Sequence, residues 1–295
     1  MKSIHLLSSV VFLLAVKVAL FGPPVSVSAQ TLSAQQQLAH DIRTAPVELE
    51  LMTYAEVYSA IHEQGKTTVL VFNGGTEQRG PHAVLGGHTF IARSVANEIA
   101  RKLGNALVAP VFPFSPTDAF VNPKWPGTIT VSADLYTGIN EAVVASMVVA
   151  GFKNIVLMGD HGGGQKELED LARALDSKYG PQGAHVFYCG AAYTKARDDF
   201  NAILKQKNFP LSNHAGIPDT SELMYLGEDK YVRKNKIVAG DAVLAPDQQR
   251  DPHVPLVNNG IQGDPRGSTP ELGKLALDIK IADAVEEIQR LIDAR

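Results

Sequence analysis

The stretch TTVLVFNGGTEQRG, residues 67–80, decides the fold predicted for this chain. Its first six residues are apolar or β-branched, and Asn73, Gly74 and Gly75 follow them as turn-forming residues. A short apolar run that ends in turn residues is typical of a strand buried on both faces. The polar residues that come next, among them Glu77, are therefore expected at the carboxyl end of a central strand.

Helical and strand patterns alternate along the chain after this stretch. Ile91, Val95 and Ile99 recur every four residues, as on one face of an amphipathic helix, and Gly104 ends that pattern. The same reasoning predicts the remaining elements, with strands at residues 107–111, 154–159 and about 185–189 and helices at 134–150 and around 168–175. This alternation predicts an α/β fold with a mainly parallel sheet that is covered on both faces.

Three polar, glycine-rich clusters lie beyond the predicted strands. They occupy residues 73–88 after the first strand, 160–165 after the third, and 213–221 after the fourth. Ligands of open parallel sheets bind beyond the carboxyl ends of the strands. We therefore expect all three clusters to meet at one edge of the sheet.

Charge and composition argue against several classes of protein. The 295 residues carry a formal net charge of −4 and no stripe of Lys or Arg, so no nucleic-acid partner is expected. After the N-terminus, no apolar run has the length of a membrane span, so the mature chain is expected to have no membrane contact. Cys189 is the single cysteine and lies in an apolar run, which favours a buried structural thiol.

The N-terminus has the pattern of a secretory signal peptide. Lys2 precedes an apolar run, and a stretch of small residues ends at Ala29, where cleavage is expected. The alternative is an uncleaved anchor, and Lys17 inside a short apolar core argues against it. We therefore expect an exported protein, periplasmic or secreted. Its predicted parts are a signal peptide at 1–29, a polar arm at 30–45 and the functional domain at 46–295.

Histidine and carboxylate side chains at strand ends fit a site for a divalent metal ion. Imidazole nitrogen and carboxylate oxygen are common ligands of zinc, and two histidines with one glutamate leave a position for water. Other interpretations of the same residues stay open at this level. A single glutamate can cap a helix, a single histidine can be structural, and the glycines at 162–164 could cradle a phosphate.

Several motifs, in their order along the chain, resemble the creatininase (creatinine amidohydrolase) family. They are Glu77-Gln78-x-Gly80-x-His82, Trp125-Pro126-Gly127-Thr128, Gly159-x-His161-Gly162-Gly163, His214-Ala215-Gly216-x-x-Asp219-Thr220-Ser221 and Gly263-Asp264-Pro265-Arg266. The resemblance spans about Thr53 to Ile292. It implies a three-layer αβα sandwich, a homo-oligomer, and metal-assisted hydrolysis of amide bonds in small molecules.

The resemblance assigns roles position by position. Glu77 and His161 match ligands of the family's first metal ion. Asp219 stands where the family has a glutamate that belongs to the metal site or acts as a general base. His214 matches a histidine that lies behind the ligands or faces the substrate.

Three positions depart from the family pattern. Arg79 replaces a histidine of the second metal ion, His88 replaces the aspartate that usually bridges two ions, and Gly163 replaces a glutamate of creatininase itself. Arginine cannot ligate a cation, and a neutral imidazole has one lone pair and cannot bridge two. We therefore expect one divalent ion per chain, with zinc favoured over manganese or iron. Its expected ligands are Glu77, His88 and His161, with Asp219 as fourth ligand or base.

Two further residues have competing interpretations. Arg79 could bind a substrate carboxylate or stabilise an oxyanion, or it could form a structural ion pair with Asp160 or Asp118. His82 could donate to the substrate, support a ligand, or be structural.

The expected activity is hydrolysis of a C–N bond, linear or cyclic, in a small polar molecule. Two alternatives remain: a metal-dependent lactonase that cleaves a C–O bond, and an exported small-molecule-binding protein without catalysis.

Overall fold

The computed structural model describes residues 46–117 and 120–295. The predicted signal peptide and polar arm, residues 1–45, lie outside the described residues and stay predictions, as does any role for Asp118. Within the described ranges, no helix combines the length and the apolar composition needed to cross a bilayer.

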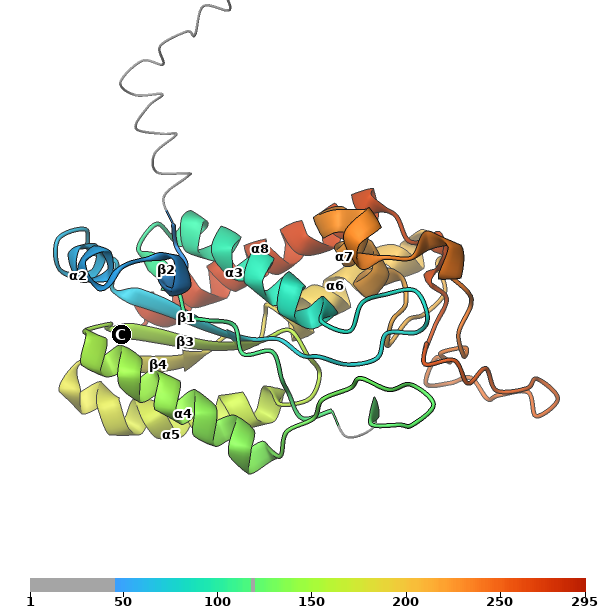
Figure 1. Ribbon diagram of the computed structural model, residues 1–295, viewed down its shortest axis with the longest axis horizontal. Helices are drawn as coiled ribbons and strands as arrows, with labels where there is room; N and C mark the ends of the chain where they lie inside the picture. The colour runs from blue at the N-terminus through green and yellow to red at the C-terminus, as the bar shows by residue number, and fades with distance from the viewer. Residues whose placement is uncertain (1–45, 118–119) are drawn as a thin grey trace, which may run out of the picture. The chain divides into compact units, whose positions relative to one another are not determined.

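Four parallel strands form the central sheet (Figure 1). They are β1 (Thr68–Asn73), β2 (Ala106–Val108), β3 (Asn154–Gly159) and β4 (His185–Tyr188), in the spatial order β2-β1-β3-β4. The parallel sheet of the predicted α/β fold is thus confirmed. β1 and β3 pair along their whole length, with Asn73 opposite Gly159, so their carboxyl ends lie side by side.

Helices cover both faces of this sheet (Figure 1). One face carries α3 (Gly87–Leu103), α6 (Thr194–Gln206), α7 (Ile217–Tyr231) and α8 (Pro270–Asp293), and the other carries α4 (Ala133–Ala150) and α5 (Gln165–Tyr179). The remaining helices are α2 (Tyr54–His62) and short 3-10 turns at Leu49–Leu51, Gly180–Gln182, Lys234–Lys236 and Pro265–Gly267. The three-layer αβα arrangement is therefore confirmed.

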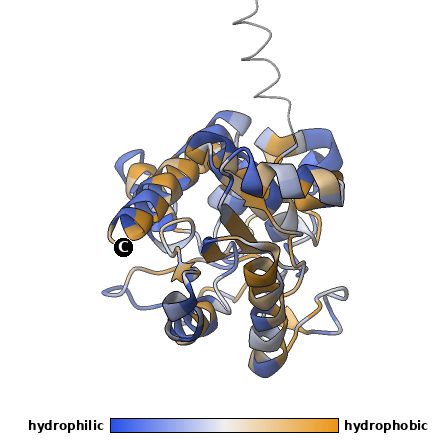
Figure 2. Ribbon diagram, turned by 90° about the vertical axis from the view of Figure 1, so that its left-hand side faces the viewer, coloured by the Kyte–Doolittle hydropathy of each residue, from blue (hydrophilic) through white to orange (hydrophobic). Residues whose placement is uncertain are grey.

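Strand side chains alternate between two hydrophobic cores. In β1, Leu70 and Phe72 pack into the core with α3, α7 and α8, whereas Val69 and Val71 pack into the core with α4 and α5. All four are at most 4% exposed, which explains why the strand is apolar without alternation. The helices carry hydrophobic and hydrophilic residues side by side along their length (Figure 2), as expected for helices that bury one face.

Cys189 lies directly after β4 and is a free, buried thiol. Burial raises the pKa of this thiol well above its usual value, which keeps it protonated and unreactive. The expected structural role of the cysteine agrees with this position.

Candidate metal centre

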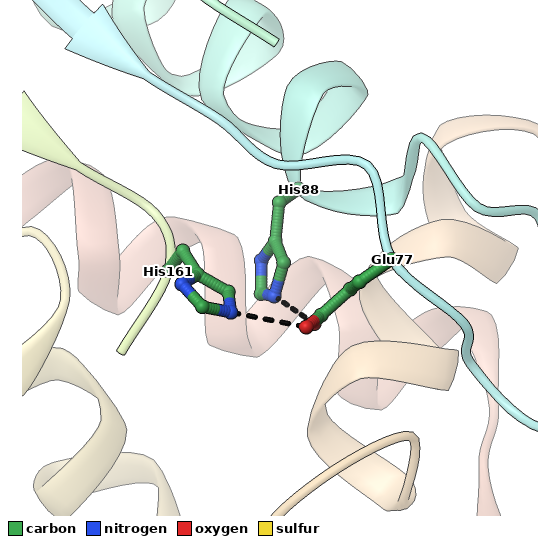
Figure 3. A group of neighbouring side chains, drawn as sticks. All are labelled: Glu77, His88 and His161. Carbon is green, nitrogen blue, oxygen red and sulfur yellow. Dashed lines mark hydrogen bonds and ion pairs between the residues drawn. The ribbon is translucent and has the colours of Figure 1, made fainter. Parts of the chain in front are cut away.

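Three side chains from separate segments meet at the carboxyl edge of the sheet (Figure 3). Glu77 lies in the loop after β1, His88 in the first turn of α3, and His161 directly after β3. One ligand atom from each lies within 4.8 Å of the others. The side-by-side ends of β1 and β3 account for this convergence.

Both imidazoles point at the carboxylate of Glu77 (Figure 3). His88 Nε2 is 2.9 Å from Glu77 Oε1, and His161 Nε2 is 3.0 Å from Glu77 Oε2. Burial by itself would raise the pKa of Glu77, but the hydrogen bonds from His161 and His88 hold it well below its usual value. Two imidazole nitrogens around an ionised carboxylate are a donor set that fits zinc or a similar divalent ion.

A buried chain of charged groups supports His88. Its Nδ1 lies 2.9 Å from Asp160 Oδ2, and Lys280 of α8 donates to Asp160 Oδ1 over 2.6 Å. Lys280 also lies 3.1 Å from Glu222 Oε1 in α7. An Nδ1–H that is donated to Asp160 leaves Nε2 of His88 free to act as the ligand atom, as is common for metal-bound histidines.

The charge of Lys280 is stabilised by its two partners. Burial would lower the pKa of Lys280, but Asp160 and Glu222 raise it above its usual value. Burial raises the pKa of Glu222 to about 7, despite the neighbouring lysine. Sequence reasoning did not find Lys280 or Glu222. The available signal was a lysine flanked by Ile279 and Ile281 in an amphipathic helix.

His161 has a different kind of support, supplied by one glycine. The backbone N–H of Gly163 lies 3.0 Å from His161 Nδ1, and the carbonyl oxygen of Gly163 lies 3.3 Å from the same atom. The glycine thus offers both a donor and an acceptor to the ring, and a metal-bound ring would donate Nδ1–H to the carbonyl. A Cβ at Gly163 would lie 1.9 Å from the carbonyl oxygen of Pro116, so this loop has no room for a side chain at this position.

Arg79 is completely buried beside Glu77. Its Nη1 lies 3.3 Å from Asp219 Oδ1, and its Nη2 lies 3.8 Å from Glu77 Oε1. The pairing proposed from the sequence was with Asp160 or Asp118, and the structure corrects the first, because Asp160 bonds to Lys280 and His88 instead. The guanidinium has no exposed surface in this structure, so it is not open to a substrate carboxylate here, and its nitrogens have no hydrogen-bond partner among the described residues.

Asp219 contacts the backbone as well as Arg79. Its Oδ2 accepts a 2.6 Å hydrogen bond from the backbone N–H of Ala215. Burial would raise the pKa of Asp219, but the charge of Arg79 lowers it to about 2. Asp219 does not belong to the group of three ligand atoms, although it lines the same pocket.

The two remaining predicted residues lie in different positions. His82 is fully buried, its Nε2 lies 2.9 Å from Thr220 Oγ1, and burial lowers its pKa to about 4. His214 reaches the centre itself, with Nδ1 at 3.5 Å from Glu77 Oε1. Its Nε2 lies 2.7 Å from the carbonyl oxygen of Gln78, and its ring stacks on Phe120 at 4.0 Å.

The centre opens into a pocket of about 170 Å³. Sequence reasoning missed several of the residues around it. Thr117 donates to Glu77 Oε2 over 3.0 Å, and Tyr193 and Arg197 line the pocket from α6 and the residue before it. Nothing in the sequence distinguishes these residues, because each depends on loops and helices that pack from elsewhere.

Comparison with known proteins shows the family. The sequence model of the creatininase (creatinine amidohydrolase) family matches residues 50–288. A mycofactocin precursor peptide peptidase of Mycobacterium ulcerans is 26% identical over 239 residues, which cover 76% of this chain and 85% of that protein. A 3-dehydro-scyllo-inosose hydrolase of Thermotoga maritima is 26% identical over 121 residues, which cover 41% of this chain and 37% of that protein.

Solved structures show the same fold. A creatininase described as the Mn form has a TM-score of 0.66 at 21% identity, covering 83% of this chain and 98% of its own. A mutant creatininase described as Zn-Zn type has a TM-score of 0.65 at 19% identity and covers 84% of this chain and 98% of its own. A putative creatinine amidohydrolase from Bacteroides fragilis has a TM-score of 0.59 at 19% identity, covering 82% of this chain and 94% of its own.

Proposed function

The chain belongs to the creatininase family of metal-dependent hydrolases, and we propose that it hydrolyses a C–N amide bond of a small polar molecule with one divalent ion per chain. The proposed ligands are Glu77, His88 and His161. The observation that carries this proposal is the meeting of these three side chains within 4.8 Å at the carboxyl edge of the sheet.

The surroundings of Glu77 favour a single ion. The guanidinium of Arg79 is a fixed, buried positive charge 3.8 Å from Glu77 Oε1. A second cation beside it would be repelled, and His88 cannot bridge two ions. Gly163 offers no side-chain ligand. These residues support a centre with one ion, in contrast to the Zn-Zn form named for one related creatininase.

A divalent ion held by Glu77, His88 and His161 would supply a Lewis acid and would lower the pKa of a water molecule towards neutrality. We propose zinc for this donor set, with manganese and iron as alternatives that the same ligands accept. One related creatininase is named as its Mn form and another as its Zn-Zn form.

His214 is the side chain best placed to accept the proton of the attacking water. Its Nε2 donates to the carbonyl of Gln78, so Nδ1 carries the lone pair and lies 3.5 Å from Glu77 Oε1. Asp219 has a pKa of about 2 and is engaged by Arg79 and Ala215, which makes it a weak base. We therefore assign Asp219 to holding Arg79, and His214 to proton transfer.

Metal analysis of protein purified without chelator tests the proposal. We expect one ion per chain for the wild type and none for His161→Ala. His62→Ala, at an exposed histidine in α2, is the matched control and should keep the ion. Two ions per chain in the wild type would contradict our assignment of Arg79 and His88.

A substrate panel separates the alternatives. Linear amides, lactams and lactones are offered to the protein loaded with zinc, manganese or iron. Turnover of amides or lactams supports the proposal, and turnover of lactones alone favours a C–O hydrolase. Absence of turnover with every metal would leave the non-catalytic binding protein.

We also propose that the protein is exported and forms a homo-oligomer. The first rests on the signal-peptide pattern at residues 1–29. The second rests on the resemblance to the creatininase family, which implies a homo-oligomer.

A further inference from the structure

One cation on the rim of the pocket has no carboxylate partner in the described part of the chain. Arg197 lies near the start of α6, is exposed, and lines the metal pocket. It also lines a smaller cavity of about 40 Å³ whose walls come from α6, α7 and α8. Within residues 46–117 and 120–295, its contacts are with the ring and hydroxyl of Tyr193.

The other charged side chains around these two cavities differ from Arg197, because each has an oppositely charged neighbour. Asp219 faces Arg79 at 3.3 Å. Asp160 and Glu222 share Lys280, at 2.6 and 3.1 Å. Glu77 has the guanidinium of Arg79 at 3.8 Å. Among the described charged side chains around the two cavities, Arg197 is therefore the one that is available to bind a charged group of a ligand.

Tyr193 holds Arg197 on the rim beside His161. The guanidinium carbon lies 5.3 Å from the centre of the Tyr193 ring, and Nη1 lies 3.4 Å from the hydroxyl oxygen. Tyr193 in turn packs against the residue that follows His161, because a Cβ at Gly162 would lie 3.0 Å from that hydroxyl. The arginine is thus positioned relative to the metal centre and remains open to solvent.

We propose that Arg197 binds a carboxylate on the part of the substrate that is not hydrolysed, so that the substrate is a small anionic amide. This inference rests on the proposed function. A guanidinium can bind a carboxylate through two parallel hydrogen bonds, which fixes orientation as well as charge. Arg79, which the sequence suggested for this role, is fully buried and already faces Asp219.

The charge of the whole pocket agrees with an anionic substrate. The carboxylates of Glu77 and Asp219 line the pocket, and the guanidinium groups of Arg79 and Arg197 balance them. A bound divalent ion therefore leaves the pocket with excess positive charge. Such a pocket attracts anions and concentrates them at the site.

The inference is tested with paired metal-binding probes on the zinc-loaded full chain. The probes are the monohydroxamates of malonate, succinate, glutarate and adipate. Each is paired with a counterpart whose carboxylate is replaced by a primary amide. The hydroxamate groups are the same in both members of a pair, so calorimetry isolates the effect of the carboxylate on the dissociation constant.

We expect the wild type to bind the carboxylate probe about tenfold more tightly than its amide counterpart at one or more of the four lengths. Arg197→Gln should remove this preference, and Arg197→Lys should keep part of it because the charge remains without the planar fork. Arg173→Gln, at an exposed arginine of α5 that pairs with Asp170, is the control and should bind both probes as the wild type does.

Three outcomes would overturn the inference in different ways. Equal binding of both probes at all four lengths would exclude a carboxylate site at Arg197 and leave the metal centre intact. Failure of every probe to bind the zinc-loaded protein would contradict the metal centre itself, and with it the proposed function on which the inference rests. A preference that survives in Arg197→Gln would assign the anion site to another residue.

Discussion

His88 and His161 contact the same carboxylate, but the two histidines are supported in opposite ways. Behind His88 lies a buried chain of charges, in which Asp160 bonds to the ring and Lys280 bonds to Asp160 over 2.6 Å. Behind His161 lies the backbone of Gly163, in a loop too tight for a side chain. One ring therefore depends on electrostatic balance between distant helices, and the other on local backbone shape.

Lys280→Met would disrupt the chain of charges behind His88. Of the substitutions proposed here, we expect it to have the largest effect on stability and metal affinity. The substitution leaves Asp160 and Glu222 buried without their cation, which should cost about 3–5 kcal/mol in the free energy of unfolding. Because Asp160 then loses its fixed position behind His88, metal affinity should fall about 10–100-fold. Urea unfolding and zinc competition with a chelator measure the two effects.

The matched control for this prediction lies on the same helix. Lys274 is exposed and pairs with Asp278, and Lys274→Met should change the free energy of unfolding by about 0.5 kcal/mol or less. Lys280→Met combined with Glu222→Gln should restore part of the stability, because the amide of glutamine, unlike the buried carboxyl group, needs no cation beside it. If Lys280→Met binds zinc as tightly as the wild type does, Lys280 stabilises the fold but does not position His88.

His82 sharpens the comparison, because its ring contacts a hydroxyl rather than a carboxylate. Burial lowers its pKa to about 4 from an ordinary value near 6.5. The unfolded chain therefore binds the proton more readily than the folded one, and stability is lost as pH falls from about 6.5 towards 4. At full extent, this shift corresponds to about 3 kcal/mol in the free energy of unfolding.

His82→Gln measures this contribution. Urea unfolding at pH 7, 5.5 and 4.5 should show that the wild type loses more stability on acidification than the variant does. The difference isolates His82 from Asp219, whose pKa of about 2 places its effect at lower pH. Parallel pH profiles for the two proteins would show that His82 is not held neutral by burial.

Gly163→Ala would disrupt the backbone support of His161. We expect its effect to be smaller than those of Lys280→Met and His82→Gln. Its Cβ would lie 1.9 Å from the carbonyl oxygen of Pro116, so the loop must move, at a cost of about 1–3 kcal/mol in the free energy of unfolding. Metal affinity should also fall, because the backbone N–H and carbonyl groups of residue 163 move away from His161 Nδ1. Gly138→Ala, at a helical glycine with open space around it, is the control. Unchanged zinc affinity in Gly163→Ala would mean that this loop does not position His161.

The sequence was sufficient for features that depend on local periodicity and order. The apolar run before Asn73 predicted a doubly buried strand, and the spacing of Ile91, Val95 and Ile99 predicted the helix that follows. Because parallel strands end at the same edge, the order of elements also predicted that Glu77 and His161 lie together. These inferences need only the backbone periods of strand and helix and the direction of the chain.

Only the tertiary structure decided which charge meets which partner. Arg79 faces Asp219, 140 residues further along the chain, and Asp160 bonds to Lys280, 120 residues further along. Burial also decided that Arg79 is closed to ligands while Arg197 stays open. Coulomb energies and pKa values depend on distance and on exclusion of water, and both are set when α7 and α8 pack against the sheet rather than by any local pattern of residues.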